Sequence, residues 1–531
     1  MKSADNFNRS FDKELSLGTN LTSIKDWSTE IPFVDAFKSA RSWITQCLPE
    51  ETGCSGSWGT DEYDKLNLDE QGWVKSLPAP EDSPEYTRVA TLLFRDVEHY
   101  PGGQYIVLYD GEGTIEYGFD AQKDESESVL GRDVINVNPS NRGIYLIITS
   151  TDPNRAGDYI RNIHVIKAEY ETSYESEIFN PDFIERIKEF QALRFMDWMG
   201  TNNSMQSEWR DRPKVDDASY AWKGAPVEIM VELANRIGAN PWFNMPHMAT
   251  DEYVSEFSQR VQDSLNPDLT AYVEYSNEVW NAQFKQFSWV RDHGLFPGGT
   301  TPYQSYGVRT AQICDIWKGA FSQPDHRVKC IMGTHTANPW VAGQVLNCDK
   351  WSQSPCYEHG IDALAITGYF SGKLGKAKNQ SAIESWIDDP NINEFEKAIT
   401  QLKDGSSLGP GDHVEAMASY FNEYAQIARE RGLELVAYEG GSHVVGTGGV
   451  ENNEKMTEFF IELHRQPEFY DLYTKMLTAW QQDPTGTRTV FMHFSDIGKP
   501  SKWGSWGALE HVDQANSPRY DALLDFIARN S

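Results

Sequence analysis

The sequence predicts an α/β fold: a (β/α)8 TIM barrel with an inserted antiparallel β-sandwich domain. Three observations indicate it. Apolar, strand-like runs alternate with amphipathic helical patterns, and eight such units can be counted along the 531 residues. Between Tyr86 and Ile166 the pattern changes to the polar–apolar alternation of antiparallel strands. The chain is also long enough for a barrel of about 250 residues and a further domain.

Each barrel unit is predicted from its own pattern. The predicted strands are 17–21, 192–198, 239–246, 271–275, 328–333, 361–369, 433–443 and 487–494. Helical spacing predicts helices over 31–45, 183–190, 227–237, 254–265, 306–321, 414–431, 459–480 and 520–528. The long segment 371–412 is expected to form a lid or a wall beside the site.

The alternating stretch defines the inserted domain. Its runs RVATLLF, GQYIVLYDGEGTIEYGF, GIYLIITS and YIRNIHVI read as strands, with a turn at 110–113. We expect the barrel to comprise residues 1–60 and 173–531 and the inserted β-sandwich residues 61–172. The insertion is expected to fall between a helix and the next strand, which is the barrel face opposite the active site.

Two predicted strands each deliver a carboxylate at their carboxyl end. Leu269 to Ala282 reads LTAYVEYSNEVWNA, an apolar strand that turns polar at Asn277 and Glu278. Leu433 to His443 reads LELVAYEGGSH and ends on Glu439 before two glycines. Barrel active sites are built at these strand ends. Retaining glycosidic cleavage requires two such carboxylates, one as acid/base and one as nucleophile, roughly 5–5.5 Å apart.

The motifs resemble those of a known clan. Asn277-Glu278 after one strand and Glu439 closing a later strand resemble the retaining glycoside hydrolases with a (β/α)8 barrel, in which these motifs end strands four and seven. YVEYSNEVWN, YEGGSH and RFMDW also resemble a group of bacterial proteins labelled cellulose-binding or hypothetical. The resemblance covers most of the chain outside about residues 60–172. It implies Glu278 as acid/base, Glu439 as nucleophile, and no cofactor.

The resemblance also implies supporting residues. Arg194, inside the second strand, is expected to support Glu439, as is Tyr369 at the end of the sixth strand. Asn277 is expected to bind a sugar hydroxyl. The structural alternative for Arg194 is an ion pair with Asp197 or another carboxylate, because an arginine inside a barrel strand must find acceptors.

Further candidate substrate-binding residues are polar or aromatic side chains near the predicted strand ends. They are Trp198, Asn244, His247, Trp280, His335, Trp340, His443, Trp503 and Trp506. Indole faces pack against the C–H face of a pyranose, and imidazoles bind hydroxyls or tune a neighbouring acid. The structural alternative is a core indole, above all for Trp280 and Trp503, and a structural hydrogen bond for each histidine.

The composition limits the binding partners and the cellular location that we expect. A formal net charge of -32 excludes a basic field for nucleic acid and leaves only a local basic cleft for acidic polymers. No apolar run is long enough for a membrane-spanning helix. The polar amino terminus lacks an apolar signal core, so the chain is either cytoplasmic or a mature secreted or periplasmic form, and we expect the second. Oligomeric state is not predicted.

Six cysteines allow fifteen pairings. Cys47–Cys54 and Cys348–Cys356 are close enough to close small loops, and Cys314–Cys330 is a further candidate. No cysteine or histidine spacing predicts a metal site.

The function that we expect is therefore retaining hydrolysis of a plant or algal polysaccharide or oligosaccharide. The alternative is a carbohydrate-binding protein without catalysis, with its strand-end carboxylates far apart or buried in ion pairs. A metal-dependent hydrolase is disfavoured. The β-sandwich is expected to be either a carbohydrate-binding module or a structural brace.

Overall fold

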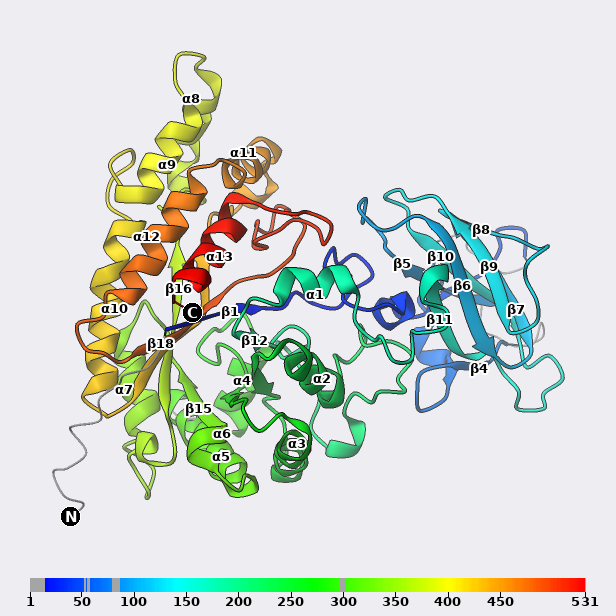
Figure 1. The fold of residues 1–531 in the computed structure, drawn as a ribbon, viewed down its shortest axis with the longest axis horizontal. Coiled ribbons are helices and arrows are strands. Elements are labelled where there is room, and N and C mark those ends of the chain that lie inside the picture. Colours follow the sequence, from blue (N-terminus) through cyan, green and yellow to red (C-terminus); the bar gives the residue numbers. More distant parts are fainter. Residues whose placement is uncertain (1–14, 52–53, 55–57, 79–85, 297–301, 531) are drawn as a thin grey trace. The chain divides into compact units, whose positions relative to one another are not determined.

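The computed structural model describes residues 15–51, 54, 58–78, 86–296 and 302–530. The chain divides into two compact units (Figure 1). The first, here called the barrel unit, comprises residues 1–22, 187–212 and 227–531. The second, the inserted unit, comprises residues 23–186 and 213–226.

The barrel unit contains a closed barrel of eight parallel strands, which confirms the predicted fold class. The strands are buried on both faces, so their sequences are nearly continuous apolar runs. In order around the barrel they are β1 (Ser16–Asn20), β12 (Ala192–Arg194), β13 (Asn240–Met245), β14 (Ala271–Tyr275), β15 (Val328–Gly333), β16 (Ala363–Phe370), β17 (Glu434–Ser442) and β18 (Arg488–His493). β18 pairs with β1 and closes the barrel.

The register between β16 and β17 shifts once. Ile366 lies opposite Ala437 and Thr367 lies opposite Glu439, so Tyr438 is an extra residue in β17. Such a β-bulge re-aims the side chains around it. The bulge lies directly before Glu439.

Helices of the barrel unit follow most of the strands. They are α2 (Val227–Ile237), α3 (Asp251–Ser264), α4 (Lys285–His293), α5 (Pro302–Ala320), α6 (Pro324–Arg327), α7 (Pro339–Asn347), α8 (Gln380–Asp388), α9 (Glu394–Asp404), α10 (Val414–Arg429), α11 (Glu454–His464), α12 (Phe469–Gln481) and α13 (Pro518–Asn530). The helix α1 (Pro181–Ile187) precedes β12, and the division between the two units falls at its last residue.

Three sequence predictions about elements need correction or detail. No helix spans 31–45: this segment contains only the short 3-10 helix η2 (Ala36–Ser39) and the strand β2 (Ile44–Gln46). Phe37 and Ala40 have the predicted burial, but they pack in the inserted unit. The helix predicted over 459–480 is two helices, α11 and α12, separated at Pro467. The segment 371–412 contains α8 and α9.

The inserted unit contains two four-stranded antiparallel sheets. One has the order β2-β5-β10-β7 and the other β11-β6-β9-β8, and β3 and β4 form a separate pair. Their bounds are β3 (Asn67–Leu68), β4 (Val74–Ser76), β5 (Arg88–Leu93), β6 (Gly103–Asp110), β7 (Gly113–Phe119), β8 (Ala121–Lys123), β9 (Arg132–Val137), β10 (Ile144–Thr151) and β11 (Arg161–Lys167). Burial along these strands is not strictly alternating, unlike the sequence pattern: β5 is buried over five consecutive residues and β6 over three.

The insertion point differs from the prediction. The inserted unit begins at residue 23, directly after β1, and runs to residue 186 in α1. It therefore occupies the connection from a strand to its following helix, not from a helix to the next strand. A second segment of this unit, 213–226, lies between β12 and α2. The expected boundary near residue 60 is thus too late, because the segment 31–45 joins the sandwich instead of forming a barrel helix.

Cysteine pairing is as the short loops predict. Disulfides join Cys47 to Cys54 and Cys348 to Cys356. Cys314 and Cys330 are free and buried, so the third candidate disulfide is not formed. Among the described residues, no helix is both long and apolar enough to cross a membrane.

Candidate active site

Glu278 lies three residues after β14, in a tight turn. Ser276 and Glu278 have positive φ angles of 58° and 42°. Non-glycine residues rarely adopt this left-handed conformation, and it often marks functional sites. The Glu278 carboxylate is half-buried and accepts hydrogen bonds from Asn281 Nδ2 at 2.9 Å and Tyr438 Oη at 3.0 Å. The turn and the two donors fix the direction of this carboxylate.

Glu439 lies in β17 and is 7% exposed. Arg194 Nη1 donates to its Oε1 at 2.8 Å, and Tyr369 Oη donates to its Oε2 at 3.0 Å. Tyr438, directly before it, donates to Glu278. The bulge at Tyr438 therefore places two successive residues of one strand in contact with the two halves of the site.

Arg194, at the end of β12, is fully buried. Besides Glu439, it binds Glu274 through Nη2 at 2.9 Å and Nε at 3.2 Å. It also donates to Asn20 Oδ1 at 3.0 Å and Asn277 Oδ1 at 2.9 Å. The guanidinium thus has acceptors on β1, β14 and β17 and in the turn after β14, and the arginine that the sequence predicts to need carboxylates has two.

Asn277 is held on several sides. Its Oδ1 accepts from Arg194, and its Nδ2 donates to Asn202 Oδ1 at 3.1 Å. Gln286 of α4 donates to the Asn277 carbonyl at 2.9 Å and to Asn202 at 2.8 Å. Asn277 is 3% exposed. The amide is therefore fixed beside Arg194.

Burial and charge set the ionisation of the site. Burial raises the pKa of Glu439 to about 8, the Arg194 ion pair opposes this, and the Glu278 charge adds to it. The two carboxylates therefore interact electrostatically. Burial, together with the charges of Glu439 and Glu278, raises the pKa of Tyr369 well above its ordinary value, so this phenol stays protonated and donates. The same causes act on Tyr438.

Arg194 is shared by two carboxylates, and this limits what it does for each. Burial alone would lower the pKa of Arg194, but Glu274 and Glu439 raise it above its ordinary value. Burial raises the pKa of Glu274, against the opposing effect of Arg194, Trp242 and Asn244. One positive charge therefore serves two buried carboxylates.

The predicted tryptophans fall into two groups. Trp198 is fully buried and packs against Phe195, so it offers no exposed face. Trp280 is 9% exposed and lies edge-on to Tyr438, beside the site. Trp340, on α7, and Trp503 are 54% and 64% exposed. These two have the exposed indoles that a sugar platform requires.

Trp506 packs against Tyr369 and His443. Its ring centroid is 6.0 Å from Tyr369 and 5.0 Å from His443. Gly504, with φ 130°, lies under this indole, where a Cβ atom would come within 2.4 Å of the ring. Trp506 and His443 therefore flank the tyrosine that binds Glu439.

The other predicted polar residues are dispersed. Asn244 is fully buried and donates to Glu274 and to the Ser276 carbonyl, each at 2.8 Å. His247 is 3% exposed, and burial lowers its pKa to about 4, so its imidazole is neutral. His335 is exposed, and its carbonyl accepts from Tyr424 at 3.0 Å. Asn244 thus holds Glu274, which is the ion-pair partner of Arg194.

Sequence reasoning missed Glu274, Tyr438 and Asn20. Glu274 has a recognisable signal, since it is a carboxylate inside an otherwise apolar strand and Arg194 is a cation inside another. Tyr438 has none, because its role depends on the β-bulge. Asn20 is the last residue of β1, where a polar strand end is typical of a barrel site.

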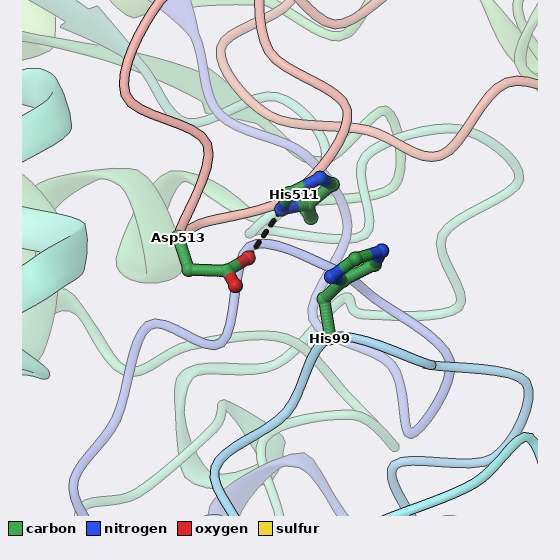
Figure 2. A group of neighbouring side chains, drawn as sticks. All are labelled: His99, His511 and Asp513. Carbon is green, nitrogen blue, oxygen red and sulfur yellow. Dashed lines mark hydrogen bonds and ion pairs between the residues drawn. The ribbon is translucent and has the colours of Figure 1, made fainter.

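Outside the site, His511 and Asp513 are neighbouring residues with side chains that can bind a metal ion. His511 Nδ1 and Asp513 Oδ1 are hydrogen-bonded to each other in the segment before α13 (Figure 2). Figure 2 also draws His99, which belongs to the inserted unit. Within the barrel unit this pair supplies two ligand atoms, fewer than the three or four protein ligands of a zinc site.

Solved structures are similar to about two thirds of the chain. No protein-family model matches the chain, and no curated protein has a similar sequence. Among solved structures, a fungal β-1,4-galactanase matches with 12% identity over 66% of this chain and 92% of its own, with a TM-score of 0.36. A broad-specificity endoglucanase from Clostridium acetobutylicum matches with 12% identity, 66% and 89% coverage and a TM-score of 0.37. An endo-β-1,4-mannanase from Cellulomonas fimi matches with 10% identity, 64% and 62% coverage and a TM-score of 0.32.

The strand order and the helices define the fold class of the molecule. It is a (β/α)8 barrel with two glutamates at or just beyond the carboxyl ends of β14 and β17.

Proposed function

We propose that this chain is a retaining O-glycoside hydrolase that cleaves a plant or algal polysaccharide or oligosaccharide through a covalent glycosyl-enzyme. One observation carries the proposal. Tyr438 donates to Glu278, and the adjacent Glu439 accepts from Arg194 and Tyr369. Two coupled carboxylates thus have different partners, as an acid and a nucleophile require.

In this mechanism the two glutamates act in sequence. Glu439 attacks the anomeric carbon while Glu278 donates a proton to the departing glycosidic oxygen, which leaves an ester between Glu439 and the sugar. Glu278, now ionised, takes a proton from water, and that water attacks the same carbon. The ester breaks, Glu439 is released as a carboxylate, and Glu278 is protonated again.

The remaining site residues have positioning and binding roles. Arg194 and Tyr369 orient Glu439 and stabilise its ionised form. Asn277 is proposed to contact the sugar beside the reacting bond, since it directly precedes Glu278 and its Oδ1 accepts from Arg194, which also binds Glu439. Trp280, Trp506, Trp340 and Trp503 are proposed sugar-binding indoles, with His247, His335 and His443 as polar contacts.

The proposal has one competing function with support of its own. A carbohydrate-binding protein without catalysis would also bury a strand-end carboxylate in an ion pair, and Glu439 is 7% exposed and paired with Arg194. Catalysis distinguishes the two. The two disulfides favour an oxidising compartment, so we propose a secreted or periplasmic location.

The test is a screen of the full chain against a panel of plant and algal polysaccharides, followed by variants on the substrate that is cleaved. Glu278→Gln and Glu439→Gln should each lower kcat by at least about a thousandfold, on the scale of removing an essential group. Glu434→Gln is the matched control, since Glu434 lies at the opposite end of β17 and pairs with Lys329.

Chemical rescue separates the two roles. Azide should restore turnover to Glu439→Ala and give a glycosyl azide whose anomeric configuration is opposite to that of the substrate. The native enzyme should give a product of retained configuration. Full activity of both glutamine variants, or binding without cleavage across the panel, would contradict the proposal.

A further inference from the structure

The inserted unit contains a pocket of its own. Its volume is about 450 Å³, and it is lined by Arg41, Trp58, Leu92, Arg95, Phe119 and Arg142. All six residues belong to the inserted unit, whereas both catalytic glutamates belong to the barrel unit. Cavities of about 300–1,000 Å³ are typical of ligand sites. The pocket is therefore a candidate site separate from the proposed catalytic centre.

An aromatic stack forms one part of the pocket. Trp58 is 53% exposed and stacks on Phe119, with ring centroids 5.9 Å apart and an interplanar angle of 13°. Phe119 in turn stacks on Tyr145 at 4.8 Å. Phe119 and Tyr145 therefore support one face of the exposed Trp58 indole. A supported indole with a solvent-facing surface is the kind of platform on which the C–H face of a pyranose packs.

Three guanidinium groups form the other part. Arg142 lies over the Phe119 ring at 4.3 Å, and none of the ion pairs between described residues involves it. Arg95 is 3.6 Å from Asp96, with both side chains partly exposed. Arg41 is paired with Asp26 at 2.8 Å. This concentration of positive charge stands out in a chain whose net charge is -32.

We propose that this pocket binds an acidic sugar unit of a polysaccharide, with its pyranose ring on Trp58 and its carboxylate or sulfate at Arg142 and Arg95. Planar guanidinium groups match the paired oxygens of both anions. The ring platform and the cations lie in one cavity, which fits a ligand that is both a sugar and an anion. Neutral glycans would satisfy only the platform.

Binding should be measured on the full-length chain carrying Glu278→Gln, so that cleavage does not interfere. Two matched pairs of probes isolate the charge: polygalacturonate with its methyl ester, and dextran sulfate with dextran. Polyglutamate provides the anion without the sugar. At physiological salt, at least one acidic glycan should bind about tenfold or more tightly than its neutral partner and than polyglutamate, as a charge-assisted contact predicts. The acidic glycan that binds distinguishes carboxylate from sulfate recognition.

Variants then locate the binding. Arg142→Gln and Trp58→Ala should each weaken it about tenfold, and Arg95→Gln provides a second cation variant if Arg142→Gln does not fold. Arg155→Gln is the matched control, since Arg155 is exposed in a turn of the same unit. Equal affinity for charged and neutral partners, equal binding of polyglutamate, or affinity unchanged by the pocket variants would overturn the proposal. Because binding is measured without turnover, its failure leaves the proposed hydrolysis untouched, and the converse also holds.

Discussion

Arg194 Nη1 donates to Glu439 Oε1 at 2.8 Å although the two residues lie on β12 and β17, which are not neighbours in the barrel. The contact therefore crosses the barrel interior, where both side chains are almost inaccessible to solvent. On its other side the same guanidinium binds Glu274. This shared cation determines much of what the site is expected to do when its residues are changed.

Replacing Arg194 should destabilise the fold. Arg194→Met leaves Glu274 and Glu439 buried without their cation, and uncompensated buried charge costs about 3–5 kcal/mol. Denaturant unfolding at pH 9, above the pKa of about 8 of Glu439, measures this loss. The loss should shrink at acidic pH, where both carboxylates are protonated. Arg210→Met, at a side chain that is 85% exposed, should change the free energy of unfolding by less than about 0.5 kcal/mol.

Tyr369→Phe should move the pH profile of activity. The Tyr369 hydroxyl lowers the pKa of Glu439, which burial raises to about 8. In the proposed mechanism Glu439 must be ionised to attack, so activity should fall as pH drops through this pKa. Removing the donor should shift the acid limb of kcat/KM upward by about one pH unit.

The control for this shift is Tyr420→Phe, whose hydroxyl donates to the Tyr369 carbonyl and not to Glu439. It should leave the acid limb in place. An unchanged or lowered acid limb in Tyr369→Phe would show that the tyrosine does not lower the pKa of Glu439.

Glu439→Gln should change how stability depends on pH. A carboxyl whose pKa is raised on folding makes the native state bind more protons than the unfolded state between the two pKa values. The wild-type chain therefore loses stability as pH rises toward about 8, and the variant lacks this loss. The difference in Tm, variant minus wild type, should increase from pH 5 to pH 9.

Glu434→Gln should show no comparable increase, because Glu434 lies at the other end of the strand and is paired with Lys329. A constant difference in Tm between Glu439→Gln and wild type would mean that folding does not raise the pKa of Glu439.

The disulfide between Cys348 and Cys356 should stabilise the barrel unit. It closes a short loop of 8 residues in sequence separation, for which the loop-entropy relation gives about 2–3 kcal/mol. The double variant Cys348→Ala/Cys356→Ala should lose that much in denaturant unfolding. Reducing agent should then affect the double variant only through Cys47–Cys54, and a double variant as stable as wild type would contradict the expected contribution.

Much of the barrel could be predicted because buried parallel strands leave a strong local signal. The strands 271–275 and 328–333 and the helix 227–237 have the predicted bounds. The helical spacing of Phe33, Phe37 and Ala40 led to the wrong prediction of a barrel helix over 31–45. A helical period over a few apolar residues does not show which core those residues are buried in. Pro467 marks the break between α11 and α12, since proline interrupts a helix.

The site was predicted in part for a similar reason. Glu278, Glu439, Arg194 and Tyr369 lie at strand ends, where sequence shows a polar residue after an apolar run. The role of Tyr438 depends on a register shift between β16 and β17, and the role of Glu274 depends on which way a mid-strand side chain points. Both are tertiary facts that no local pattern encodes. The burial of Trp198 in the core could not be predicted for the same reason.

The place of β1 in the barrel has a consequence for how the chain acquires its fold. β1 pairs with β12 beyond the inserted segment and with β18 near the carboxyl end. During synthesis β1 can pair with β12 once that strand is made, but its other edge stays unpaired until β18 follows. The strands β2 to β11 of the inserted unit all lie within residues 44–167 and can pair earlier. A nascent chain halted before residue 488 should therefore contain a protease-resistant inserted unit and a protease-sensitive barrel unit that lacks its eighth strand, β18.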